Sequence, residues 1–203
     1  PRKGWNSFAF KKACELITSK GIKHVITTSP PHSSQLIGLR LKKKFPEIKW
    51  IAELRDPWTD IYYYEQFYPT LLSKFIDTHL EKKVLKNADT IITVGESLKK
   101  HFEAKEPEAE RKTTVIHNGF DEEDFKEIKA AAPSRFTLTY VGTLSDIYPL
   151  DGLLEALKKV KSEGIDFLLR FTGTVSPNSM ARIKASLPGK NIEFIPYAKH
   201  NEA

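Results

Sequence analysis

The sequence has 203 residues, of which 40% are hydrophobic and 29% are charged, so a globular protein of one large or two small domains is expected. No apolar run approaches the roughly 20 residues that cross a bilayer, and the single cysteine excludes an intrachain disulfide. The net charge of +6 is uneven: residues 1–105 carry 19 Lys and Arg against 11 Asp and Glu, whereas the remainder carries 13 against 15. This asymmetry favours an anionic partner for the first half, although the helix dipole alone also favours lysine near helix ends.

The first 60 residues alternate between helical spacing and short β-branched or apolar runs. The predicted elements are a helix capped by Asn6-Ser7 and ended by Gly21, a strand over 24–28, a helix from Ser33 or Ser34 that closes at 45–47, and a buried strand over 48–54. This order is that of a βαβ unit with parallel strands, preceded by a helix.

The next 60 residues continue the pattern after an aromatic segment, 61–68, which is either a stacking surface or a partly buried lid. A long helix over 69–86 is expected to pack one apolar side, formed by Leu72, Phe75, Ile76, His79, Leu80 and Leu85. A strand over 89–94, a helix opened by Gly95, a surface loop over 103–112 and a strand over 113–116 follow.

A change of composition at 121–134 predicts a linker, after which the pattern resumes. Strands are expected over 136–141, 166–171 and 192–195, with helices over 150–162 and 177–187. The chain is therefore predicted to be α/β, with two Rossmann-like parallel-sheet halves: residues 1–120, the linker 121–134, and residues 135–203.

Polar residues and glycines gather where four of the predicted strands end. These segments are Thr28-Ser29-Pro30-Pro31, Arg55-Asp56-Pro57-Trp58, His117-Asn118-Gly119 and Val141-Gly142-Thr143-Leu144. Ligands of open parallel sheets bind beyond the carboxyl ends of the strands, so these segments are expected to border a ligand cleft. Gly142 suits close backbone approach, although Gly142 and Gly173 fit turns equally well. The helix that begins near Leu150 offers N–H groups to a phosphate.

Motifs for other chemistries are missing from the sequence. It contains no GxSxG, HExxH, CxxC or Walker A pattern, and His79 has no other ligand type at metal-binding spacing. Serine hydrolases, zinc proteases and P-loop kinases therefore have no positive support in the sequence.

Several spaced motifs together resemble bacterial group 1 glycosyltransferases, that is, glycosyltransferase family 4. They are Gly4-Trp5, the run from Val25 to Pro31, the run from Trp50 to Trp58, Ala88–Val94, Val115–Asp121 and Tyr140–Leu144. The resemblance implies a GT-B fold, in which two Rossmann-like domains close over a nucleotide-sugar donor. It also implies transfer of the sugar to an acceptor hydroxyl with retention at the anomeric carbon. The nucleotide-sugar is then the substrate, and neither a metal ion nor another cofactor is expected.

The resemblance also suggests which residues form the site. Asp56 and Arg55 stand where many relatives have His-Asp near the reacting sugar, so they are the predicted catalytic residues. Arginine in place of histidine puts proton shuttling in doubt and makes Arg55 a fixed cation. The predicted substrate-binding residues are Ser29, Pro30, Trp58, Asn118, Gly119, Gly142, Thr143 and Gly173. Of these, Asn118-Gly119 resembles the turn at the domain junction and Gly142 the loop glycine beside the donor diphosphate, although Thr143 replaces a basic residue that relatives often carry.

The family's first glycine-rich loop and its paired glutamates have no counterpart in these 203 residues. The resemblance therefore makes residues 1–120 the C-terminal part of the N-terminal, acceptor-side domain and residues 135–203 the first part of the C-terminal, donor-side domain. Both domains are expected to be incomplete, and this stretch alone is expected to be inactive. The resemblance points to surface polysaccharide or lipopolysaccharide biosynthesis in the cytoplasm at the inner face of the membrane. The implied partners are a nucleotide-sugar donor, a glycan or lipid-linked acceptor and, peripherally, a membrane.

Two alternatives remain open. One is a sugar-nucleotide epimerase of the same fold, for which Asp56, Glu53 and His117 are the candidate acid/base residues. The other is a non-catalytic basic module that binds nucleic acid, which requires the lysine clusters and Tyr62–Tyr64 to share one face. The glycosyltransferase interpretation is preferred, and no nucleic acid partner is expected with it.

Overall fold

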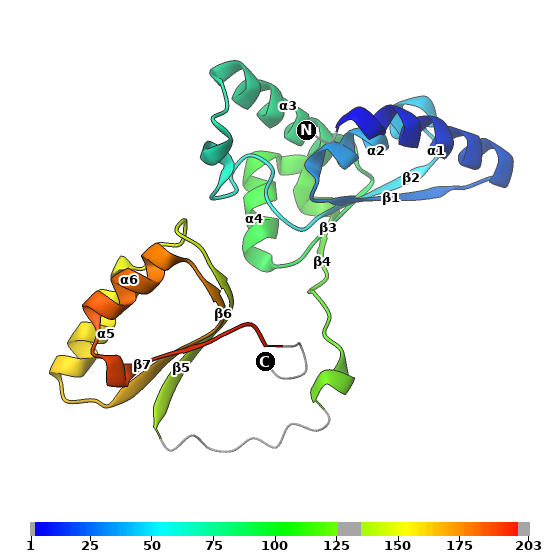
Figure 1. The fold of residues 1–203 in the computed structure, drawn as a ribbon. Helices are drawn as coiled ribbons and strands as arrows, with labels where there is room; N and C mark the ends of the chain where they lie inside the picture. Colours follow the sequence, from blue (N-terminus) through cyan, green and yellow to red (C-terminus); the bar gives the residue numbers. More distant parts are fainter. Residues whose placement is uncertain (1–2, 126–134, 199–203) are drawn as a thin grey trace. The chain divides into compact units, whose positions relative to one another are not determined.

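The computed structural model describes residues 3–125 and 135–198, and the chain divides into two compact units, Pro1–Phe120 and Asp121–Ala203. Each unit is built around its own parallel sheet (Figure 1). Of the predicted linker 121–134, residues 126–134 lie outside the described residues, and a 3₁₀ turn, Glu122–Phe125, precedes them.

Unit 1 contains a four-stranded parallel sheet in the order β1-β2-β3-β4. Its strands are β1 (His24–Ser29), β2 (Lys49–Leu54), β3 (Thr90–Thr93) and β4 (Thr113–Val115). Its helices are α1 (Asn6–Lys20), α2 (Gln35–Lys44), α3 (Leu71–Asn87) and α4 (Glu96–Lys105), with 3₁₀ turns at Lys3–Trp5, His32–Ser34, Tyr64–Phe67 and Pro107–Lys112. In the register, Ser29 at the end of β1 lies opposite Leu54 at the end of β2.

The core of unit 1 forms where α2, α3 and α4 pack against β2 and β3, and the fully buried Trp50 is its largest side chain. The indole Nε1 donates to Thr27 Oγ1 at 2.8 Å, which satisfies the only polar atom of that ring. Gly38 of α2 faces the same indole: a Cβ there would lie 2.1 Å from Trp50 Nε1. Absence of a side chain at Gly38 therefore lets α2 approach the sheet.

Unit 2 contains a three-stranded parallel sheet in the order β5-β6-β7. Its elements are β5 (Phe136–Leu144), α5 (Asp151–Ser162), β6 (Phe167–Val175), α6 (Pro177–Ser186), a 3₁₀ turn (Gly189–Asn191) and β7 (Ile192–Ile195). Both helices lie on the same face of the sheet, where Leu154, Leu157 and Ile183 pack on Phe167 and Phe171 (Figure 1). The predicted α/β class with two Rossmann-like halves is confirmed.

Three local predictions are wrong. Asn6-Ser7 does not cap α1, because the helix already begins at Asn6, whose Nδ2 donates instead to Ser33 O at 2.7 Å. The segment 103–112 is not a surface loop, because α4 continues to Lys105 and the following 3₁₀ turn buries Ala109. Strands β5 and β6 run three or four residues further than expected, so Gly142 and Gly173 lie inside paired strands rather than in turns.

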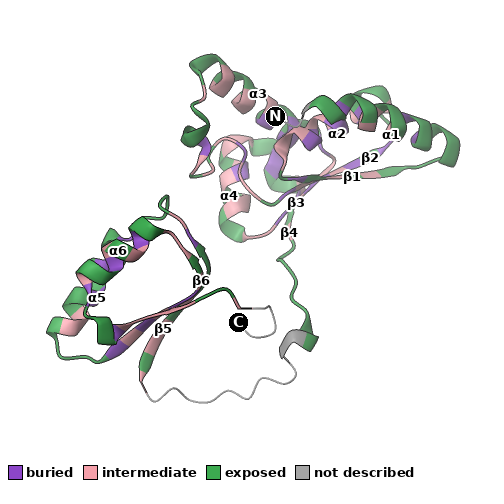
Figure 2. Ribbon diagram, viewed as in Figure 1, coloured by how far each residue is buried: buried purple, intermediate pink, exposed green. Residues whose placement is uncertain are grey.

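The predicted apolar side of α3 is only half correct. Leu85 is buried, but Leu72 and Phe75 are 68% and 71% exposed. The buried residues of the helix are Glu81, Val84 and Leu85, so only its second half rests on the core (Figure 2). Within the described residues, every helix is too short or too polar to cross a membrane.

Candidate functional site

The carboxyl ends of the four strands of unit 1 meet at one edge of the sheet, as parallel pairing requires. The Arg55 N–H donates to Ser29 O at 3.2 Å, and the Ile116 N–H donates to Thr93 O at 2.8 Å. Thr93 Oγ1 donates to Leu54 O at 2.9 Å and joins the two central strands at the same level. The segments after β1, β2 and β4 therefore leave the sheet together.

Two predicted site residues from different strands are in contact at this edge. Arg55 Nη2 donates to Asn118 Oδ1 at 3.1 Å, and both side chains are exposed. Asp56 follows Arg55 and is half-buried, while Gly119 follows Asn118 and is exposed. The edge thus presents the Arg55 guanidinium, held by an amide from a strand end 63 residues away, and the carboxylate of Asp56, its neighbour in the sequence.

Ser29 and Trp58 are located less favourably for direct ligand contact. Ser29 has no exposed surface, and its hydroxyl donates to Glu53 O at 3.2 Å while accepting from Gln35 Nε2 at 3.0 Å. Its hydroxyl therefore joins β1, β2 and α2 instead of pointing to solvent. Trp58 is 7% exposed and stacks on His32 with ring centroids 5.5 Å apart, so it is a wall of the site and not an open platform.

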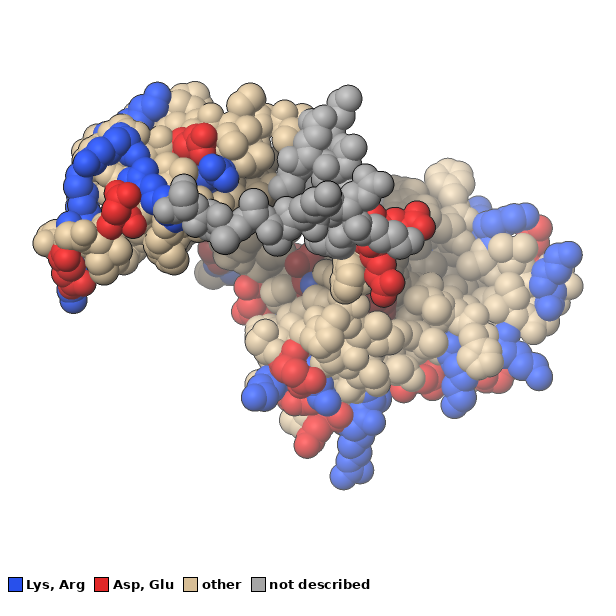
Figure 3. All heavy atoms as spheres, turned by 90° about the horizontal axis from the view of Figure 1, so that it is seen from below, with Lys and Arg blue, Asp and Glu red and all other residues tan. Residues whose placement is uncertain are grey.

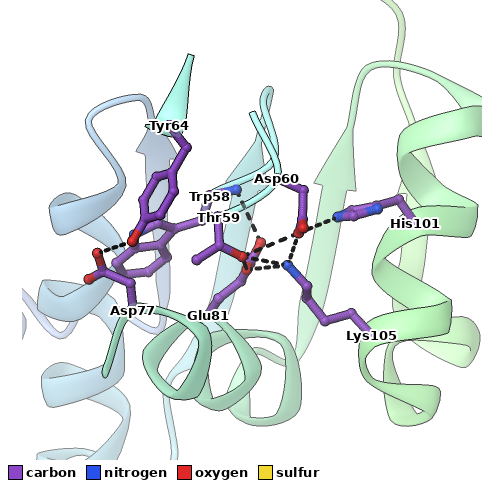
Figure 4. Close-up of polar contacts among 8 residues, drawn as sticks. All are labelled: Trp58, Thr59, Asp60, Tyr64, Asp77, Glu81, His101 and Lys105. Carbon is purple, nitrogen blue, oxygen red and sulfur yellow. Dashed lines mark hydrogen bonds and ion pairs between the residues drawn. The ribbon is translucent and has the colours of Figure 1, made fainter. Parts of the chain in front are cut away.

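A buried polar network, which sequence reasoning missed, holds the loop after β2 (Figure 4). The carboxylate of Glu81 on α3 accepts from the Trp58 N–H at 3.1 Å, from Thr59 Oγ1 at 2.7 Å and from Lys105 Nζ at 2.6 Å. Lys105 of α4 also donates to Thr59 Oγ1 at 2.7 Å and to Asp60. Because Glu81 is almost fully buried and Lys105 nearly so, this pair fixes three consecutive loop residues, 58–60.

Two carboxylates and a histidine in this network could in principle hold a metal ion. Ligand atoms of Asp60, Glu81 and His101 lie within 4.8 Å of one another. The Lys105 ammonium, however, contacts both carboxylates and supplies the positive charge that they need. Burial raises the pKa of Asp60, but the hydrogen bond and charge of Lys105 outweigh that effect and hold the pKa below its usual value. The donor set therefore fits an ion-pair network better than a metal centre.

Next to this loop lies a pocket of about 420 Å³ that belongs entirely to unit 1. It is lined by Pro30, Pro31, His32, Ser33, Trp58, Ile61, Tyr63, Tyr64, Phe67 and Asp77. The Tyr64 hydroxyl donates to Asp77 Oδ2 at 2.9 Å (Figure 4). Burial, with this bond, raises the pKa of Tyr64 to about 12. Burial lowers the pKa of His32 despite nearby carboxylates, so the ring is neutral at physiological pH.

The aromatic segment 61–68 was the sequence signal for this pocket, since it was expected to be a stacking surface or a partly buried lid. In the structure the segment is partly buried and partly exposed: Tyr64 is buried, whereas Tyr62 and Phe67 are exposed. Asp77 on α3 gave no signal in the sequence.

The remaining predicted site residues lie in unit 2 and form a separate group. Gly142 and Gly173 are paired across β5 and β6, with φ of 136° and 124°. A Cβ at Gly173 would lie 2.3 Å from Gly142 O, so the close backbone approach requires glycine there. Together with Thr143 they line a small cavity of about 120 Å³. The first turn of α5 already carries a carboxylate, Asp151, which pairs with Arg182, so this helix end suits an added anion less than expected.

Among the described residues, one face of the molecule shows no continuous basic surface. On the face drawn in Figure 3, lysines and arginines are scattered among acidic and uncharged residues instead of forming one stripe.

Comparison with known proteins places these features in a family. The model of Glycosyltransferase Family 4 matches residues 2–124, which include the whole of unit 1 from α1 to β4. A search of curated proteins finds no match.

Among solved structures, the chain is similar to the apo form of the lipopolysaccharide outer core galactosyltransferase WaaB, with a TM-score of 0.63 and 12% identity over 96% of this chain and 49% of that one. It is similar to TarM, with a TM-score of 0.55 and 14% identity over 92% of this chain and 36% of that one. A third match is a structure of accessory secretory protein 1, 2 and 3 from Streptococcus pneumoniae, with a TM-score of 0.50 and 11% identity over 95% and 36%. The chain thus spans less than half of each of these three structures, and the likeness shows that its two sheets share the GT-B fold.

Proposed function

Because the chain belongs to Glycosyltransferase Family 4, we propose that the full protein transfers a sugar from a nucleotide-sugar donor to an acceptor hydroxyl, with retention at the anomeric carbon. The family match over unit 1 is the observation that carries this proposal. The contact between Arg55 and Asn118 supports it, because it joins two of the family's motif positions at one edge of the sheet.

The proposed roles follow from the chemistry of each group. Arg55, held by Asn118, supplies a fixed positive charge and a fork of N–H donors near the reacting sugar. Asp56 beside it supplies a carboxylate that can hydrogen-bond a sugar hydroxyl. On the donor side, backbone groups of Gly142, Thr143 and Gly173 approach the diphosphate, whose developing charge is met by N–H groups without a metal.

The proposed acceptor is a glycan or a lipid-linked glycan of surface polysaccharide or lipopolysaccharide biosynthesis. WaaB, to which the chain is structurally similar, is a lipopolysaccharide outer core galactosyltransferase. This similarity supports the class of acceptor without identifying the sugar. Such an acceptor places the enzyme in the cytoplasm at the inner face of the membrane.

The exposed face of α3 supports a peripheral membrane contact. Leu72 and Phe75 are solvent-exposed in the first half of the helix. Lys82 follows Phe75 by seven residues and Lys83 follows Leu72 by eleven; both lysines are exposed, and each spacing brings the lysine to the side of the helix that carries its apolar counterpart. An apolar patch followed by lysines is complementary to a bilayer with anionic headgroups, into which the apolar side chains insert.

Nucleotide specificity provides the direct test of the main proposal. We expect one of the UDP-, GDP- or ADP-sugars to raise the melting temperature of the full-length protein, because a ligand that binds only the folded state stabilises it. If none of them shifts the melting temperature, the glycosyltransferase proposal fails.

A further inference from the structure

The pocket between the loop after β2 and helix α3 has no function in the account above. We propose that it binds an uncharged sugar ring, namely a ring of the acceptor glycan next to the hydroxyl that receives the transferred sugar. This proposal rests on the proposed function, and it specifies that the acceptor glycan has an uncharged sugar ring next to the reacting hydroxyl. Its volume of about 420 Å³ lies within the roughly 300–1,000 Å³ usual for small-molecule sites.

The charge of the pocket excludes anionic ligands. Among the described residues that line it there is no Lys or Arg, and Asp77 contributes a carboxylate. A phosphate or diphosphate would therefore meet a like charge in a partly desolvated site without a compensating cation. The pocket is thus unsuited to the donor diphosphate and to a lipid phosphate.

The polar atoms of the pocket favour a ligand with hydroxyl groups over a hydrocarbon chain. Asp77 and the Tyr64 hydroxyl lie 2.9 Å apart in the same wall. An alkyl chain would cover these groups without pairing them, which costs free energy, whereas sugar hydroxyls can both donate and accept.

The other walls are flat and apolar, as the faces of a sugar ring require. Trp58, Tyr63 and Phe67 present aromatic surface, and Pro30 and Pro31 add aliphatic surface. Aromatic rings bury a large area at a small cost in conformational entropy, so they hold a rigid ring through its C–H faces.

The location of the pocket connects it to the proposed catalytic edge. Pro30 follows the end of β1, and Trp58 lies two residues after Asp56 in the loop after β2. Asp56 is also close enough to His32 to act on its pKa. A sugar ring in the pocket would therefore lie near Asp56, the carboxylate to which we assign a hydrogen bond with a sugar hydroxyl.

The test is saturation-transfer NMR on the 203-residue chain with the methyl glycosides of glucose, galactose, mannose, N-acetylglucosamine and rhamnose. At least one should bind, and Phe67→Ala should weaken that binding about tenfold because an aromatic wall is lost. Asp77→Asn should weaken it as well. Tyr68→Ala is the matched control, since Tyr68 is a neighbouring, 91% exposed aromatic that does not line the pocket.

Three results would overturn the proposal: no glycoside binds, Phe67→Ala binds as well as Tyr68→Ala, or octyl glucoside binds where methyl glucoside does not. The last result would assign the pocket to a hydrocarbon chain. Inorganic pyrophosphate should fail to displace the glycoside, and competition by it would contradict the charge argument. No donor is present in this experiment, so its outcome does not depend on sugar transfer. If the full-length protein bound none of the nucleotide-sugars while the chain still bound a glycoside, the proposed function would fail and the sugar site would stand.

Discussion

Glu81 of α3 and Lys105 of α4 form an ion pair of 2.6 Å below the loop that follows β2, and each of them also bonds that loop directly. The pair is buried, and it links two helices that are separate in the sequence. The position of Trp58, and of Asp56 two residues before it, therefore depends on residues far from it in the sequence.

Lys105→Met should be strongly destabilising, since it leaves the Glu81 carboxylate buried without its cation. We expect the free energy of unfolding to fall by about 3 kcal/mol or more, measured by chemical denaturation. Glu81→Gln in the Lys105→Met background should restore part of the loss, because no buried charge then remains.

The control for this variant is Lys12→Met, which removes an exposed ion pair with Glu15. It should change the stability by less than about 1 kcal/mol. Equal effects of Lys105→Met and Lys12→Met would show that the network does not hold the loop.

Gly173→Ala should destabilise unit 2, because the added Cβ meets Gly142 O at 2.3 Å and φ is 124°. The expected loss is about 2 kcal/mol. Gly152→Ala in α5 is the matched control: no described atom lies within 4 Å of the added Cβ, so stability should rise by about 0.5–1 kcal/mol. Thermal unfolding of both variants is the measurement, and an unchanged Gly173→Ala protein would contradict the close strand approach.

Acid should weaken unit 1 through Asp89. Burial raises the pKa of this carboxyl, but the hydrogen bonds from Lys42 and from the Trp50 N–H, together with the charges of Lys42 and Lys49, hold it below its unfolded value of 3.8. A depressed pKa contributes stability that is complete above the unfolded pKa and is lost as the pH falls through the folded pKa. Denaturation curves from about pH 5 downward should therefore show declining stability, with a smaller slope in Asp89→Asn. A variant with the same acid slope as the original chain would refute this role.

The membrane proposal can be tested by co-sedimentation with vesicles. Leu72→Ser combined with Phe75→Ser should weaken binding to phosphatidylglycerol vesicles by about tenfold or more, because two large apolar side chains no longer insert. Phe8→Ser, which changes an equally exposed aromatic on α1, should have little effect. Equal binding to purely zwitterionic vesicles would contradict the charge complementarity.

We also expect the 203 residues alone to release no nucleotide from any nucleotide-sugar in the presence of a glycan acceptor. The chain spans 49% of WaaB, so a full donor site is expected to need more of the fold. Nucleotide release by this stretch above a heat-denatured control would refute the prediction.

Much of the fold could be predicted because its signals are local. Alternation of β-branched runs with helical spacing located the strands and helices to within a few residues, and parallel connections then implied that strand ends meet. The contact between Arg55 and Asn118, 63 residues apart, follows from that logic.

What could not be predicted depends on packing between distant segments. Leu72 and Phe75 have the spacing of a buried face, but only the second half of α3 reaches the sheet. Glu81, Lys105 and Asp77 are ordinary charged residues in helical segments, and nothing in their local sequence marks them as neighbours of one loop or pocket. Gly142 and Gly173 gave a turn signal, whereas the strands continue through them because two backbones can approach where no Cβ intervenes.

Helix α3 contributes to three features within seven residues. Phe75 lies on its exposed face, Asp77 forms a wall of the pocket, and Glu81 binds the loop that follows β2. A hydrogen-bonded helix moves as one body over so short a span, so a surface that pressed on Phe75 would displace the pocket wall and the loop anchor together. Contact at the exposed face of α3 is thus mechanically coupled, through one helix, to the pocket and to the loop that follows β2.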